Sequence, residues 1–342
     1  MKSSFVKGLV VVALSLLLIP IVPAIISHFT ADEPAIPAYA PIVEAEQKTA
    51  YQLLDEVRVY DVVSQTSATL SVEEYMVESV CASISADAEP EMLKAQAVMM
   101  YTYILGRRLE EVRSPTPELY GCDISTDTNR YTPLMPKAVF DAMYKDKAED
   151  YLKNIEEAVE SVMGEYIAYQ GMPIVPAYCF SCGGVTESAQ SVLGEAVGYL
   201  GEVESEFDSD YQTDVMYTQE ELFARITTQP DGITLLGDPS DWLNITKTTD
   251  TGYVLEVTLD STNVVTGAQL AQWLNLPSPR FTVSYSEEFE SFTFKVYGSG
   301  HLVGLSQYGA NKMAKEGMSH TEILEYFYSG AKVCESVSYD QK

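Results

Sequence analysis

The sequence predicts an α+β fold in which a pair of helices precedes a part rich in antiparallel strands. Apolar residues recur at three- and four-residue spacing over residues 72–82 and 90–109, which is typical of helices that bury one face. Proline at position 90 suits the first turn of the second helix. After Gly164 the pattern changes to short alternating or apolar runs separated by Gly, Pro and Asp, which is typical of strands. Because helices and strands are segregated along the chain, an α+β fold is favoured over a doubly wound sheet.

Two further groups of segments extend this pattern. More helices are expected over residues 151–163, 267–274, 308–316 and 320–327. The strands are expected over residues 165–171, 173–180, 253–260, 280–286 and 291–298. No internal repeat is visible, so the sequence does not predict a repeat architecture.

An uncharged apolar run over residues 9–26 predicts an N-terminal membrane anchor. At about 1.5 Å per residue, a helix of this length nearly spans the hydrocarbon core of a bilayer. Lys2 and Lys7 precede the run and acidic residues follow it, so the positive-inside rule places the basic side in the cytoplasm. The sequence therefore predicts a single-pass protein of the cell membrane, with residues 1–8 in the cytoplasm and the C-terminal domain outside it.

A cleaved signal peptide is the alternative for the same run. An uncleaved anchor is preferred, because the run is longer than a usual signal-peptide core and the Ala-x-Ala candidate at residues 38–40 is distant and precedes Pro41. Residues 27–50 are rich in Pro, Ala and Glu without a sustained period, which suits an extracytoplasmic tether. The folded domain is then expected over residues 51–335, with a short tail over residues 336–342.

The composition is strongly acidic. There are 50 Asp and Glu residues against 21 Lys and Arg residues, a formal net charge of -29. Such a surface repels the phosphate backbone of nucleic acids, so we expect no nucleic-acid partner. The simpler explanation of this negative net charge is that it keeps the protein soluble. It is preferred over binding of a specific cationic partner.

Four separated blocks of sequence occur in the order found in one bacterial family. They are VEEYMVESV with EMLKAQAV, MGEYIAYQGMPI with CGGVTES, VVTGAQLAQWLNLPSPRF, and GSGHLVGLSQYGANKMAKEGMSHTEILEYFYSG. The resemblance runs over residues 51–332, and the last block is the most specific. On these blocks the chain is identified as a divergent member of the stage II sporulation protein D (SpoIID) family, which is related to amidase enhancers of the cell wall.

This resemblance implies a membrane-anchored lytic transglycosylase that cuts denuded peptidoglycan glycan strands in a cleft during engulfment of the forespore. It also implies partners among the membrane proteins of the engulfment machinery, including a cell-wall amidase. Cleavage of the glycosidic bond needs a proton from a carboxylic acid in a shielded site. In the lytic reaction the 6-hydroxyl group of the sugar replaces water, so one Glu side chain serves as acid and then as base.

The position of that Glu is occupied here by Ser83. Counting from Glu73 to Gln96 against the family pattern needs no gap, and the acid falls on residue 83. A serine hydroxyl cannot act as a carboxylic acid near neutral pH, so we expect lost or weak catalysis.

The alternative is an active transglycosylase with a substitute carboxyl group. Asp87 and Glu89 lie in the loop after Ser83, and Glu78 lies on the helix before it. Against this alternative, solvated loop carboxyl groups keep ordinary pKa values and are mostly ionised at neutral pH.

Other polar positions of the family pattern are also changed. The Arg of its second helix is replaced by Tyr101, which removes a cation suited to an anionic sugar substituent. Its His-Ser-Thr-Ser-Gly-Gly sequence is replaced by Cys-Phe-Ser-Cys-Gly-Gly over residues 179–184. Its zinc ligands, where present, correspond here to Thr116, Cys122 and Thr128, so one ligand is kept.

The resemblance still implies a groove that binds glycan. Its expected residues are Tyr101, Ser181, Gly183, Gly184, His301, Ser306, Gln307 and Tyr308. Glycines beside His301 would let the backbone approach a ligand closely, whereas the plain alternative is a structural histidine in a glycine-rich turn. The residues expected to line one cleft are Ser83, Tyr101, Cys179, Cys182 and His301.

The cysteines leave a further alternative, a metal or redox site. Cys179 and Cys182 have the spacing of a metal knuckle. Cys122 with Cys81 or His301 would complete four ligands for a zinc ion. A disulfide between Cys179 and Cys182, or two structural cysteines on a strand, is the simpler interpretation, and no other cofactor is expected.

Overall fold

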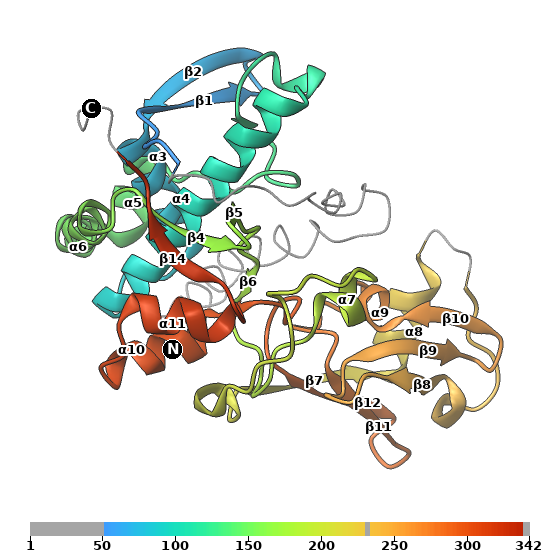
Figure 1. Cartoon of the computed structure of the whole chain (residues 1–342). Helices are drawn as coiled ribbons and strands as arrows, with labels where there is room; N and C mark the ends of the chain where they lie inside the picture. Colours follow the sequence, from blue (N-terminus) through green and yellow to red (C-terminus); the bar gives the residue numbers. More distant parts are fainter. Residues whose placement is uncertain (1–50, 230–232, 338–342) are drawn as a thin grey trace, which may run out of the picture. The chain divides into compact units, whose positions relative to one another are not determined.

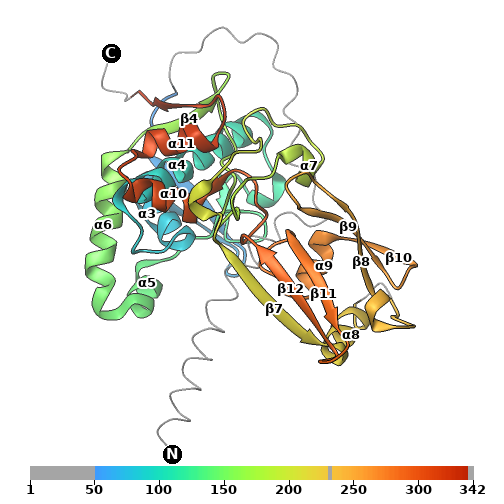
Figure 2. The same ribbon diagram turned by 90° about the horizontal axis from the view of Figure 1, so that it is seen from below.

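The structure is a computed structural model that describes residues 51–229 and 233–337 (Figures 1 and 2). The described chain has mixed helices and several small, mostly antiparallel sheets, which confirms the predicted α+β class. The predicted anchor over residues 9–26 lies outside the described residues, and none of the described helices is long and apolar enough to cross a membrane.

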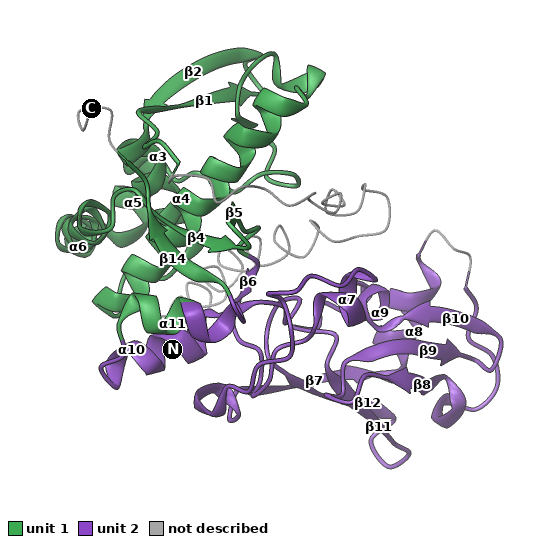
Figure 3. Cartoon of the chain, in the orientation of Figure 1, with its two compact units in different colours: residues 1–176, 319–324, 331–342 green, residues 177–318, 325–330 purple. Residues whose placement is uncertain are grey.

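The chain divides into two compact units, which Figure 3 shows in different colours. Among the described residues, unit 1 comprises residues 51–176, 319–324 and 331–337. Unit 2 comprises residues 177–318 and 325–330. The chain therefore passes from unit 1 to unit 2 and back twice, the second time over residues 325–330.

Unit 1 combines a strand hairpin, a group of helices and a second small sheet. In the first sheet, β1 (Glu56–Asp61) pairs antiparallel with β2 (Thr66–Ser71) and parallel with β3 (Ile124–Ser125). In the second sheet, β4 (Glu165–Tyr169) pairs antiparallel with β14 (Lys332–Glu335) and β5 (Met172–Pro173). The α-helices are α3 (Val72–Ser83), α4 (Pro90–Arg113), α5 (Lys137–Tyr144) and α6 (Ala148–Ser161), and short 3-10 helices cover Pro117–Leu119 and Lys145–Lys147.

Helices α3 and α4 begin where local chemistry favours a helix start. The Ser71 hydroxyl accepts a hydrogen bond from the backbone N–H of Glu74 at 3.1 Å, and the Glu74 carboxylate accepts one from the backbone N–H of Ser71 at 2.8 Å. This capping box satisfies two donors that the first turn of α3 leaves open. Pro90 is the first residue of α4, where its missing N–H breaks no helical bond.

His320 connects the C-terminal part of unit 1 to α4 and β4. Its Nδ1 lies 3.0 Å from Oε2 of Glu91, and its Nε2 lies 2.9 Å from Oε2 of Glu165. The hydrogen bond with Glu165, followed by that with Glu91, raises the pKa of His320. His320 therefore joins three segments of one unit.

Unit 2 contains two three-stranded antiparallel sheets. The first has the order β11 (Phe281–Ser286), β12 (Ser291–Tyr297), β7 (Gln212–Thr218), and the second has the order β10 (Asn263–Thr266), β9 (Val254–Leu259), β8 (Leu243–Thr248). Two short strands, β6 (Tyr178–Cys179) and β13 (Leu305–Ser306), pair in parallel. The helices are α7 (Ala189–Leu193), α8 (Gln219–Thr227), α9 (Gly267–Trp273), α10 (Gln307–Lys315) and the 3-10 helices Glu206–Asp208 and Pro239–Asp241. Helix α11 (His320–Phe327) is shared between the units.

Both of these sheets in unit 2 contribute side chains to one apolar core. Helices α8 and α9 cover it with Leu222, Ile226 and Leu270. The ring of Trp242 stacks on that of Phe292 in β12, with 6.1 Å between ring centroids and an angle of 11° between the planes. The loop of residues 298–304 follows β12, which is one strand of this core.

The structure contains elements that the sequence pattern did not predict, among them the β1–β2 hairpin before the helix pair, β7, β8, α5 and α8, and it interrupts one predicted strand. The helices expected over residues 72–82, 90–109, 151–163, 267–274 and 308–316 are present with one or both ends shifted, and the helix expected over residues 320–327 is present with the expected bounds. The single strand predicted over residues 173–180 is wrong, because only its two ends pair. Pro176 lies between these two ends and has no N–H to donate to a sheet ladder, which explains the break.

Candidate functional site

Ser83, at the position expected for the catalytic acid, is the last residue of α3. Its side chain is buried, and its hydroxyl lies 3.8 Å from the sulfur of Met100 in α4. This position therefore offers a weakly polar contact between two helices and no carboxyl group.

The two loop carboxyl groups lie in different surroundings. Asp87 is exposed, and its carboxylate accepts a hydrogen bond from the Ser85 hydroxyl at 2.6 Å. Glu89 is half-buried and occupies the N-cap position of α4, where its side chain makes no capping bond. Asp87 therefore belongs to a local polar turn, and Glu89 precedes the first turn of α4.

Glu78 on α3 is the carboxyl group of this region with a raised pKa. Burial raises the pKa of Glu78, and the neighbouring Glu74 carboxylate adds to the rise. The side chain lines a hollow of about 360 Å³ in unit 1. A carboxyl group with a raised pKa keeps its proton to a higher pH, which is one property of a general acid.

Tyr101 lies inside unit 1 and is 0% exposed. Its hydroxyl accepts a hydrogen bond from the backbone N–H of Leu54 at 3.2 Å and lies 3.1 Å from the Ser336 hydroxyl. Burial raises the pKa of this phenol. Tyr101 therefore links α4 to the segment of Leu54 and to the segment of Ser336.

Asp208 is the centre of a buried hydrogen-bond network in unit 2, and it is 0% exposed. Its carboxylate accepts hydrogen bonds from the Ser181 hydroxyl at 3.1 Å and from the backbone N–H groups of Cys182 at 2.9 Å and Gly184 at 3.3 Å. The Ser306 hydroxyl also donates to it. Three of the expected glycan-binding residues are thus brought together by an aspartate that sequence analysis did not identify.

The glycines of this region are needed because backbone segments approach each other closely. Gly183 has φ +64°, and a Cβ atom there would lie 2.6 Å from the backbone nitrogen of Gly298. At Gly304 a Cβ atom would lie 2.0 Å from the carbonyl oxygen of Ala177. The glycines therefore pack loop against loop inside unit 2, which accounts for them without a ligand.

His301 lies inside the glycine-rich turn and is 7% exposed. Burial lowers its pKa to about 4, so the imidazole is neutral at pH 7. Its Nδ1 accepts a hydrogen bond from the backbone N–H of Val303 at 3.1 Å. These contacts are those of a residue that shapes the turn.

Cys179 and Cys182 are buried and free, with no disulfide between them. Burial raises the pKa of both thiols, that of Cys182 to about 12, with Asp208 as the second cause for Cys182. Cys122, in unit 1, is also buried and free, and its thiol donates to the Ser67 hydroxyl at 3.3 Å. Within residues 51–229 and 233–337, no three His, Cys, Asp or Glu side chains converge as a metal site requires.

Three aromatic rings meet at the surface of unit 2. The ring centroid of Phe180 lies 5.5 Å from that of Tyr211 and 6.2 Å from that of Tyr308, and the two tyrosine rings are 5.2 Å apart. The Lys312 ammonium lies 4.3 Å from the centre of the Tyr308 ring and 3.2 Å from the Asp210 carboxylate. We call Phe180, Tyr211, Tyr308 and Lys312 the Phe180 surface, because Phe180 is its most exposed ring at 44%.

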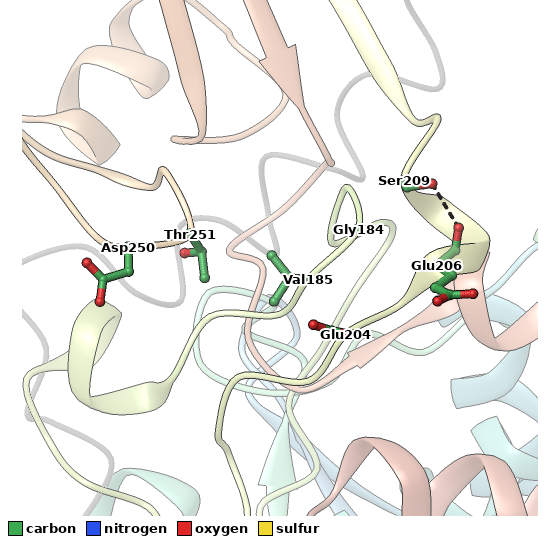
Figure 4. Close-up of a pocket in the computed structure, with 7 residues that line it drawn as sticks. All are labelled: Gly184, Val185, Glu204, Glu206, Ser209, Asp250 and Thr251. Atoms are coloured by element: carbon green, nitrogen blue, oxygen red, sulfur yellow. Dashed lines mark hydrogen bonds between the residues drawn. The ribbon is translucent and has the colours of Figure 1, made fainter.

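A hollow of about 700 Å³ borders the chain at Gly184 and Val185 in unit 2. Figure 4 shows Val185 between Thr251 on one side and Glu206 on the other. Gly184 and Ser209 also line it, and the Ser209 hydroxyl donates to the Glu206 carbonyl oxygen at 2.9 Å. Its acidic side chains favour a neutral or cationic ligand over an anionic one.

The predicted site residues are distributed over both units. Ser83 and Tyr101 belong to unit 1, whereas the remaining expected glycan-binding residues belong to unit 2. Within unit 2, Ser306 caps α10 and is followed by Gln307 and Tyr308, and the backbone N–H of Tyr308 donates to the Phe180 carbonyl at 2.8 Å. The expectation that Ser83, Tyr101, Cys179, Cys182 and His301 line one cleft stays a prediction.

Comparisons with known proteins agree on one family. Residues 60–169 match the family model described as "Stage II sporulation protein". Stage II sporulation protein D of Bacillus subtilis (strain 168) is 29% identical over 287 residues, covering 83% of this chain and 80% of that protein. The protein of the same name from Bacillus amyloliquefaciens is 28% identical over 292 residues, covering 84% of this chain and 80% of that protein. The amidase enhancer of Bacillus subtilis (strain 168) is 24% identical over 226 residues, covering 52% of this chain and 32% of that protein.

Proposed function

The chain is a divergent member of the stage II sporulation protein D family, and we propose that it binds peptidoglycan glycan strands during sporulation and cleaves them weakly or not at all. The family and the relatives, one of them an amidase enhancer, support the broader part of this proposal, a cell-wall role connected with sporulation. The narrower part, binding without efficient cleavage, rests on particular side chains.

The loss of catalysis is argued from the environment of Ser83. The residue is buried against Met100, and its hydroxyl has no acidic proton to give near neutral pH. Protonation of the leaving oxygen is the contribution of the general acid to glycosidic cleavage. A chain without a carboxyl group at this position keeps the scaffold and lacks this step.

Glycan binding is argued from the Phe180 surface, the observation that carries the proposal. Aromatic faces offer apolar area to the C–H face of a sugar ring, and the phenol groups of Tyr211 and Tyr308 can hydrogen-bond to sugar hydroxyls. Lys312 adds a cation beside the rings, which suits the carboxylate of a lactyl substituent. Phe180 belongs to the changed Cys-Phe-Ser-Cys-Gly-Gly sequence, so this change supplies an aromatic contact.

Replacing Phe180 with alanine is expected to weaken binding of denuded glycan strands by about tenfold, because one stacked aromatic ring is lost. The measurement is cosedimentation of the full chain with the strands over a range of protein concentrations. Phe289→Ala is the matched control, since Phe289 is 71% exposed in the turn between β11 and β12 and lies outside the Phe180 surface. Equal affinity of Phe180→Ala and the unmodified chain would contradict the proposal, and so would equal weakening by both substitutions.

We also propose that residues 9–26 anchor the protein in the cell membrane with residues 51–335 outside the cytoplasm. Engulfment-machinery membrane proteins, including a cell-wall amidase, are the partners proposed for that location. Protease added to intact protoplasts is expected to remove the C-terminal domain, while a cytoplasmic marker protein stays intact. Survival of the domain until the membrane is permeabilised would refute this topology.

A further inference from the structure

The hollow beside Glu78 in unit 1 has the properties of a ligand site separate from the Phe180 surface. It lies among the β1–β2 hairpin, helix α3 and the segment of residues 126–136, and its volume is about 360 Å³. This volume is within the range of small-molecule sites. It suits one small molecule or the end group of a longer one, and a glycan strand would need an extended groove.

The walls of this hollow are of two kinds. Val59 and Leu70 from the hairpin and Leu134 from the loop give it an aliphatic side. Threonines 126, 128 and 132 add hydroxyl groups. A ligand that fills the space therefore needs an aliphatic part as well as a polar end.

The charges of the lining are all negative. Asp61 and Glu78 line the hollow, and among its described lining residues there is no Lys, Arg or His. The Asp61 carboxylate is already occupied, because it accepts hydrogen bonds from the Ser64 hydroxyl at 2.6 Å and from the backbone N–H of Val63 at 2.9 Å. These bonds lower the pKa of Asp61 and keep it ionised.

Glu78 differs from Asp61 in that nothing in the described chain neutralises it. Only burial and the like charge of Glu74 perturb its carboxyl group, and no hydrogen-bond donor of the described residues contributes. Its backbone is fixed, since its carbonyl oxygen accepts a hydrogen bond from the backbone N–H of Met135 at 3.0 Å. Partial burial without a counter-charge disfavours the charged form of a carboxyl group, and a cationic ligand beside it would favour that form again.

From this arrangement we propose that the Glu78 hollow binds a primary ammonium group carried on a short aliphatic stem. The ammonium lies against the Glu78 carboxylate, and the stem lies along Val59, Leu70 and Leu134. Anionic end groups are repelled by both carboxylates. This inference does not depend on glycan binding by unit 2.

The test uses n-pentylammonium, 1-pentanol and pentanoate as probes of equal chain length, titrated into the full chain at pH 7 and followed by calorimetry. The ammonium is expected to bind in the millimolar range and at least tenfold more tightly than the alcohol, and pentanoate is expected not to bind. Glu78→Gln is isosteric and folds without burying a charge. It is expected to weaken the binding of n-pentylammonium at least tenfold. Glu118→Gln removes the same charge from an exposed position of unit 1 outside the hollow. It is expected to leave the affinity of the chain for n-pentylammonium unchanged.

Each other outcome overturns the proposal. No binding of the ammonium means that the hollow is not a ligand site of this kind. Equal affinity for the ammonium and the alcohol means that only apolar contact acts there. Equal weakening by Glu78→Gln and Glu118→Gln means that general attraction to an acidic protein explains the binding.

Discussion

Replacing Asp208 with alanine is expected to lower the free energy of unfolding by about 3–5 kcal/mol. The carboxylate is fully buried and accepts hydrogen bonds from two hydroxyl groups and two backbone N–H groups of unit 2. Alanine leaves these donors buried and unsatisfied, and each costs free energy. Urea unfolding, with fluorescence as the probe, measures the change.

The same substitution is expected to weaken glycan binding, because the network holds the loop that carries Phe180. Asp210→Ala is the control, since Asp210 is two residues away and its side chain is 71% exposed. We expect this control to leave the unfolding midpoint unchanged. An unfolding midpoint for Asp208→Ala equal to that of the control would show that Asp208 does not organise the loop.

Cleavage of glycan strands by the unmodified chain is expected to be on the order of 10² to 10⁴ slower than by a lytic transglycosylase with its catalytic Glu in place, because the proposal places Ser83 at the position of the general acid. Two further changes point in the same direction: Tyr101 is buried where the family pattern has a cation, and residues 179–184 have a changed sequence. The measurement is the rate at which 1,6-anhydro ends are released.

The helical pattern predicted that the first helix ends next to Ser83, and α3 ends at that residue, because α3 and α4 are regular and joined by a short loop. The capping box at Ser71 and the proline at position 90 mark the two helix starts in the sequence itself. Local signals of this kind fix the position of a residue along the chain. They do not fix what lies next to it in space, so the contact between Ser83 and Met100 could not be predicted.

The sequence pattern did not predict that the Tyr101 side chain is buried. Helix α4 is buried over nearly its whole circumference between Met92 and Leu105, so no apolar stripe tells which side chains face solvent. Asp208 was missed for another reason. Its partners Ser181 and Ser306 are 27 and 98 residues away along the chain, and a single acidic residue in a loop carries no local signal for such contacts.

The glycines beside His301 were expected to let a ligand approach the backbone closely, whereas in the structure the group that lies close to Gly304, and to Gly183, is another part of the same chain. Gly183 meets the backbone of Gly298, and Gly304 meets that of Ala177. Sequence alone cannot distinguish a backbone partner from a ligand, since both require the absence of a Cβ atom. The exposed Phe180, in contrast, gave no signal until its tyrosine neighbours were placed beside it.

The central claim, binding without efficient cleavage, is tested most directly by incubating the full chain with purified denuded glycan strands. Cosedimentation measures the bound fraction, and mass spectrometry of the supernatant measures the released 1,6-anhydro ends, with a lytic transglycosylase as the positive control. The account predicts saturable binding and no release above that of a buffer sample. Release at a rate comparable to the positive control would contradict it, and its loss in Glu78→Gln, Asp87→Asn or Glu89→Gln would then identify the carboxyl group that replaces the missing acid.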